Sequence, residues 1–154
     1  MQITPTVTTP PTAGQQPSDW TNPAAAAALR STVDMLASIE AGIVRDFTNV
    51  DRVRGYAYDL RSTIGIFEAA TTAITSDSSV ENDSFLPLLG QAGGGVSRAE
   101  HKLSAKDLNE TWAGERSDIL AAIRQAKNIS HHVADQLDPR SVRQPRPSVE
   151  ERGF

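Results

Sequence analysis

A single heptad register runs from Leu29 to Ile74 without a change of phase. Its apolar residues alternate between steps of three and four, which is the spacing that places side chains on one face of an α-helix. An amphipathic helix must bury that face against other helices, so the pattern predicts an all-α protein. The register is carried by Leu29, Val33, Leu36, Ile39, Ile43, Val50, Val53, Ala57, Leu60, Ile64, Phe67 and Ile74.

Two arrangements of this stretch fit the register. An unbroken phase favours one helix of about 50 residues. Thr48 and Asn49 are poor helix formers and good caps, and Thr48 with Asp51 resembles a capping box, so the local chemistry favours a break. A break predicts a hairpin of two helices over about 23–47 and 50–75. The sequence leaves both arrangements open.

The start of the stretch and the width of its apolar face both favour a bundle. Asn22 is a good N-cap, and Pro23 at the first helical position lacks only an N–H group that would have no helical partner. The apolar face is wider than a two-stranded coiled coil needs. The flanking positions that widen it hold Val33, Met35, Tyr56 and Arg61.

A second long amphipathic stretch covers residues 105–137. Ser104 with Asp107 offers a cap before it, and it ends at Asp138, because the residue before a proline leaves the helical region. The pattern predicts a helix of about 30 residues. Its apolar face is formed by Leu108, Trp112, Ile119, Ile123, Ala126, Ile129, Val133 and Leu137.

Between the two stretches, residues 76–96 predict a flexible linker. The segment is first polar and acidic, then carries a short apolar run around Pro87, and ends in four glycines within Gly90–Gly95. Ser97 followed by Glu100 resembles a capping box, which predicts a short helix over 98–103. The expected fold is therefore a bundle of three to four helices, two of them long, over residues 22–137.

Both ends of the chain predict extended, irregular arms. Residues 1–21 are rich in threonine, proline and glutamine and carry one charged side chain, Asp19. Residues 138–154 contain three prolines and begin with a basic half. Arg140, Arg143 and Arg146 in that half could contact RNA, DNA or an acidic groove. Because the only aromatic of this tail is the terminal Phe154, nucleic-acid binding is not favoured.

Composition and motifs exclude most kinds of chemical site. The chain has no cysteine, so disulfides, thiolate catalysis and Cys-based zinc sites are excluded, and its net charge of −4 argues against sequence-independent binding of nucleic acid. The glycine cluster lacks the lysine of a P-loop, and the three histidines lack the spacing of zinc ligands. We therefore predict no catalytic, cofactor-binding or metal-binding residue and a protein that is not an enzyme. No export signal or membrane span is expected.

Four large apolar residues are the main candidates for contact with a partner. Phe85, Leu86, Leu88 and Leu89 lie in the predicted linker next to the glycines. Full burial of such a side chain is worth roughly 1.5–3 kcal/mol, so exposure in a loop is costly. They either cover an end of their own bundle or insert into a partner, and both alternatives stay open.

Two short motifs resemble those of known helical proteins. Trp112-Ala-Gly114 resembles the Trp-x-Gly motif of the small helical-hairpin proteins exported by type VII secretion, in which the motif marks the turn between two helices. Ser18-Asp-Trp20, followed by Asn22-Pro23, resembles the start of the coat proteins of rod-shaped plant viruses, which are helical bundles. Each resemblance covers three to five residues of 154, so no function is carried across. Trp20 is retained as a candidate contact residue.

The arms lead to the functional hypothesis. Chain termini fray unless they are tied down, so extended arms of fixed position would be held by neighbouring subunits. We expect a non-enzymatic structural subunit of a larger ordered assembly, namely a virus or bacteriophage particle, with other copies or other subunits as partners and the virion as its location. The alternatives are a secreted helical effector or secretion-system protein, whether secreted or cytoplasmic, and a small enzyme or regulatory binding module.

Overall fold

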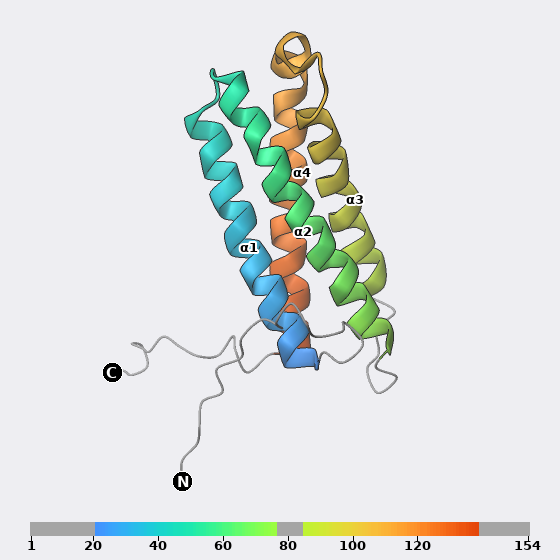
Figure 1. The fold of residues 1–154 in the computed structure, drawn as a ribbon. Helices are drawn as coiled ribbons and strands as arrows, with labels where there is room; N and C mark the ends of the chain where they lie inside the picture. The colour runs from blue at the N-terminus through green and yellow to red at the C-terminus, as the bar shows by residue number, and fades with distance from the viewer. Residues whose placement is uncertain (1–20, 77–84, 139–154) are drawn as a thin grey trace, which may run out of the picture.

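The computed structural model describes residues 21–76 and 85–138, and these residues form four helices without a strand (Figure 1). The helices are α1 (Asn22–Arg45), α2 (Val50–Ser76), α3 (Phe85–Leu103) and α4 (Leu108–Leu137). The prediction of an all-α bundle is confirmed. The predicted arms, apart from Thr21 and Asp138, lie outside the described residues, as does the segment 77–84.

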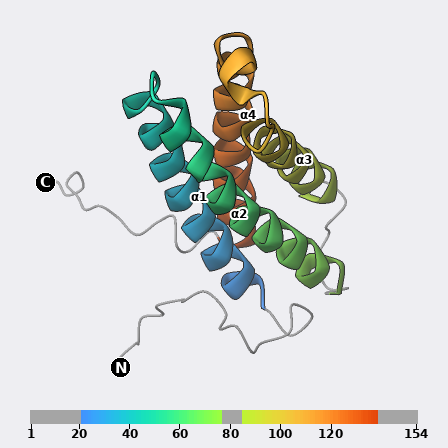
Figure 2. The same ribbon diagram turned by 45° about the horizontal axis from the view of Figure 1, so that its top comes forward.

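The four helices run alternately up and down. The α1–α2 and α3–α4 connections lie at one end of the bundle, and the start of α1 and the end of α4 lie at the other (Figures 1 and 2). Helix α1 packs beside α2 and α4, and α3 also packs beside α2 and α4. One continuous core results. Its largest fully buried side chains include Leu29, Leu36, Ile43, Leu60, Ile74, Leu89, Leu103, Leu108, Ile119 and Ile123.

The long heptad register is divided into a hairpin, which decides between the two arrangements. Helix α1 ends at Arg45, where the N–H of Asp46 donates to the carbonyl of Gly42 at 2.9 Å. Asn49 then accepts the N–H of Arg52 with both its carbonyl, at 3.0 Å, and its side-chain Oδ1, at 3.3 Å. The cap of α2 is therefore Asn49 rather than Thr48. The apolar phase continues because both helices face the same core.

The first cap also lies one residue earlier than predicted. Thr21, rather than Asn22, is the N-cap of α1, because its Oγ1 accepts the N–H of Ala24 at 3.2 Å. At the far end, the predicted stop of the last helix is confirmed, since α4 ends at Leu137 with Asp138 as its C-cap.

Helix α3 corrects the largest error of the sequence analysis. The prediction of a flexible linker up to residue 96, followed by a helix over 98–103, is wrong for residues 85–97, which are helical. Glycine in a helix costs about 1 kcal/mol relative to alanine, and this cost led us to predict a hinge. Burial outweighs it, because α3 carries a continuous apolar face at helical spacing. That face is formed by Leu89, Ala92, Val96, Ala99 and Leu103.

Trp112 ties the α1–α2 connection to α4. Its indole Nε1 donates to the carbonyl of Phe47 at 2.7 Å, and the two rings meet edge to face with centroids 5.5 Å apart. The guanidinium of Arg116 lies 4.5 Å from the centre of the Phe47 ring. Trp112 and Gly114 lie within α4, so the Trp-x-Gly motif marks no turn here.

Gly42 makes room for a second tie at the same end of the bundle. The phenol oxygen of Tyr56 accepts from Arg45 Nη2 at 2.9 Å and donates to Asp46 Oδ2 at 3.3 Å. A Cβ atom on Gly42 would overlap this phenol. The glycine is therefore required by a close approach of α2 to α1, whereas a Cβ on Gly65 of α2 would meet nothing within 4 Å.

We predict opposite effects of alanine at these two glycines. Gly42→Ala should lower the free energy of unfolding by about 1 kcal/mol, because displacing the phenol costs more than the gain in helix propensity. Gly65→Ala should raise it by about 0.5–1 kcal/mol, because only the propensity changes. Urea titrations of both variants measure the difference, and equal stabilisation by the two would contradict the role given to Gly42.

Candidate interaction groove between helices α2 and α3

The predicted contact residues lie at the start of α3 rather than in a loop. Phe85, Leu86 and Leu88 are half-buried and pack against the core, and Leu89 is a core residue with 1% of its surface exposed. The first alternative, in which this run covers its own bundle, therefore holds in large part. The other candidates, Trp20, Arg140, Arg143 and Arg146, lie outside the described residues.

A groove of about 510 Å³ lies on the surface between α2 and α3. We call it the α2–α3 groove. Its α2 wall carries Phe67 and the half-buried Ile64, and its α3 wall is open because three of its positions are glycines. The lining residues are Ile64, Phe67, Glu68, Thr71, Thr72, Leu89, Gly90, Gly93, Gly94 and Ser97.

The three glycines differ in how far the fold of this chain requires them. A Cβ on Gly93 would lie 3.6 Å from the Cβ of Phe67, which is ordinary contact. A Cβ on Gly94 would meet only the guanidinium of Arg98 at 3.9 Å, and a Cβ on Gly90 would meet nothing within 4 Å. Each glycine costs helix stability, and none is needed for close packing inside the chain. They keep the surface of α3 low and its backbone accessible from outside.

The surface around the groove is almost free of charge. Residues 62–76 of α2 and 85–97 of α3 carry a single charged side chain, that of Glu68, whereas the first twelve residues of α2 carry five. Exposed helix faces are ordinarily charged, so this half of the α2–α3 pair is unlike the rest of the bundle surface. Depletion of charge is typical of the centre of a protein–protein interface.

Interhelical ion pairs fasten the other seams of the bundle. Lys102 of α3 contacts Glu115 of α4 at 2.6 Å, and Arg30 of α1 contacts Asp135 of α4 at 2.8 Å. Arg61 of α2 donates through Nε to Glu100 of α3 at 3.1 Å. That pair lies toward the α3–α4 connection, and among the described residues no ion pair crosses the seam alongside the groove. The groove is thus the seam portion held by apolar contacts.

Two carboxylates of these pairs have altered acidity. Hydrogen bonds from Arg124, and then from Lys127, lower the pKa of Glu40 below 4.5, although partial burial opposes the shift. A hydrogen bond from Arg61 likewise lowers the pKa of Glu100. Both shifts favour the ionised form, which suits a structural ion pair and not a general acid, whose pKa is raised toward neutrality.

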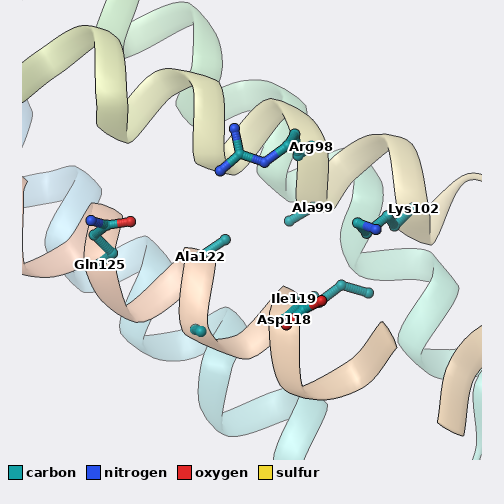
Figure 3. A pocket seen from close by; sticks show the side chains of 8 residues that line it. Arg98, Ala99, Lys102, Asp118, Ile119, Ala122 and Gln125 are labelled. Carbon is teal, nitrogen blue, oxygen red and sulfur yellow. The ribbon is translucent and has the colours of Figure 1, made fainter. Parts of the chain in front are cut away.

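A second pocket, of about 340 Å³, lies between α3 and α4 (Figure 3). Arg98 and Lys102 extend from α3, Asp118 and Gln125 extend from α4, and Ala99 and Ala122 lie between them. The only ion pair of these side chains among the described residues joins Lys102 to Glu115. The arrangement brings together neither two carboxylates nor a nucleophile and a base, so it supports no reaction.

The described part of the core holds no free polar side chain that could perform chemistry. Thr32, Thr63 and Ser130 are fully buried, and each donates its hydroxyl to a carbonyl of its own helix, at 3.0, 2.8 and 2.8 Å. His101, His131 and His132 are exposed. Across residues 21–76 and 85–138, no group of three His, Cys, Asp or Glu side chains is placed to hold a metal ion.

None of the four described helices is long and apolar enough to cross a lipid bilayer. No protein-family model matches the chain, nor does any curated protein or solved structure. The α2–α3 groove is therefore the feature of the described surface from which a function can be argued.

Sequence reasoning identified one edge of this groove and missed its walls. It singled out Phe85 to Leu89 but placed Gly90, Gly93 and Gly94 in a hinge. Two signals could have found the helix. Apolar residues continue at helical spacing from Leu89 to Leu103, and the segment 85–97 contains no charged residue, which is unusual for an exposed linker.

We predict a pH-dependent contribution of Glu40 to stability. Its folded pKa is lowered, so its contribution is present above the unfolded pKa of about 4.5 and is lost as the pH falls through the folded value. Glu40→Gln should lower the free energy of unfolding at pH 7 by about 0.5–1 kcal/mol, the scale of a half-exposed ion pair. The gap between variant and wild type should close in acid.

Chemical denaturation at pH 7 and near pH 3 measures this gap. Asp34→Asn is the matched control, because Asp34 lies on the same helix, is exposed and has no described ion-pair partner. It should change stability little at either pH. A Glu40→Gln deficit that persists in acid would show that the carboxylate acts other than through its charge.

Proposed function

We propose that this chain is a non-enzymatic structural subunit that associates with other protein chains in a larger ordered assembly, and that this assembly is a virus or bacteriophage particle. The observation that carries the proposal is the α2–α3 groove, where apolar side chains and helical glycines meet in a surface with one charged residue. A surface of this kind gains free energy when another chain covers it.

The composition of the arms supports the same role. The arm preceding Thr21 has one charged residue in its twenty, and it joins the bundle at the end where α2 ends and α3 begins, which is the end nearer the groove. Extended, uncharged arms suit contacts with neighbouring subunits, because their exposed backbone groups can pair with another chain. The choice of a virus particle rests on this pairing of a small helical bundle with two arms.

We predict that association depends on the N-terminal arm. The full chain should form oligomers much larger than a dimer at high concentration, and removal of residues 1–20 should abolish the large species. This deletion retains Thr21, whose hydroxyl caps α1, so the bundle should keep its helix content and melting temperature. Light scattering after size exclusion measures the assembly, and circular dichroism checks the fold. A full chain that stays monomeric at high concentration would contradict the proposed function.

A further inference from the structure

We propose that the α2–α3 groove is occupied by a second copy of this chain, with the α3 helices of the two copies crossing antiparallel near Gly94. The inference rests on the proposed function and names the partner at this surface. It is argued from the shape of α3, from the apolar rim of the groove and from two charged side chains at its edge.

The shape of α3 permits another helix to approach closely. Gly90 and Gly94 are one turn apart on α3, and Gly93 and Ser97 repeat that spacing one residue earlier along the helix surface. Small residues four apart allow two helix backbones to pack more closely than larger side chains would. Because a Cβ on Gly90 would meet nothing in its own chain, the space above it is open to a partner.

Apolar side chains continue the surface on both sides of this stripe. Ile64 borders the groove from α2, and Phe85, Leu86 and Leu88 lie at the start of α3, all four half-buried. A second α3 laid across the stripe would cover the remaining exposed parts of these side chains. Burial of apolar area supplies the free energy of association, and the glycines set the distance between the helices.

Two charged side chains of opposite sign favour a copy of the same chain as the occupant. Glu68 lines the groove, and Arg98 lies along α3 with its guanidinium over Gly94 and Gly95. Both are exposed, and neither has a hydrogen-bond or ion-pair partner for its charged group among the described residues. In a two-fold dimer each contact occurs twice, so one Glu68–Arg98 pairing yields two ion pairs.

The register of the crossing is consistent with that pairing. An antiparallel crossing centred on Gly94 sets Arg98 of one copy opposite Gly90 of the other, because the two positions lie four residues to either side of the centre. Gly90 and Glu68 line the same groove, so Arg98 is carried toward the unpaired carboxylate of the second copy. The same charges disfavour a helix with an acidic residue at the position of Arg98.

A cysteine at the crossing point gives a direct test with the full chain. The natural chain has no cysteine, so any disulfide formed by a single-cysteine variant joins two copies. Gly94→Cys lies at the proposed two-fold axis and should form a disulfide-linked dimer under mild oxidation, because bridged Cα atoms must come within about 7 Å. Gly114→Cys is the matched control on α4, where an added Cβ also meets nothing, and it should remain monomeric in a denaturing gel.

Sedimentation equilibrium then tests the occupant. Gly90→Leu should raise the dissociation constant of the dimer about a hundred-fold, whereas Gly114→Leu should leave it unchanged. Glu68→Arg and Arg98→Glu should each raise the constant about ten-fold, and the double exchange should restore it to within about three-fold of wild type. Circular dichroism should show the same helix content in all of these variants.

The outcomes separate this inference from the proposed function. If the full chain assembles while Gly90→Leu and the charge variants associate as wild type does, the groove inference fails and the proposed function stands. Loss of association in Gly90→Leu without rescue by the double exchange overturns the second copy as occupant. If the dimer forms as described but no larger species depends on residues 1–20, the inference stands and the proposed function fails.

Discussion

Each of the four helices has one apolar face, and none of them can bury that face without the others. Helix α2 shows the constraint most clearly, because its C-terminal half combines the buried Phe67, Ala70 and Ile74 with an outer side of small and hydroxyl-bearing residues. An isolated helix of this composition is marginal in water. The hairpin turn, the glycine helix and the cross-helix ties are all ways of bringing four such faces to one core.

The ties at the ends of the bundle fix which helices become neighbours. Trp112 of α4 donates to the carbonyl of Phe47, and Arg54 of α2 donates to the carbonyl of Ala105 at 2.7 Å. Both contacts join a helix to the connection of the other hairpin, so they hold the two connections at one end of the bundle. The interhelical ion pairs then add register along the seams, each contributing little because it is partly exposed. Apolar burial supplies the stability, and the polar contacts select one arrangement.

The sequence predicted the fold where spacing and cap chemistry agreed. Helix α4 was placed to within three residues at its start, and its end at Leu137 was predicted from the proline that follows Asp138. The hairpin was left open because the heptad phase and the caps at Thr48 and Asn49 pointed in opposite directions. The phase carried no information about chain reversal, since a short turn can return the chain with both helices still facing one core.

Helix α3 was missed because local propensity was weighed against too short a stretch of pattern. Three consecutive glycines, Gly93 to Gly95, disfavour a helix when considered alone. Their neighbours Ala92, Val96 and Ala99 are small or β-branched, so the apolar face was harder to recognise than one made of leucines. The groove was missed for the same reason, since it exists only when these glycines are helical and lie opposite Phe67.

The glycines of α3 carry an argument about the direction of selection in this surface. Gly42 shows what a glycine required by its own chain looks like, because Tyr56 occupies the space that a Cβ would take. Gly90 lacks such a neighbour, although alanine there would stabilise the helix by about 1 kcal/mol. A helix that gives up stability at a position with no internal contact, on the least charged half of its surface, is shaped by something outside the chain. Stability and association thus make opposite demands on α3, and at Gly90 the residue present suits association.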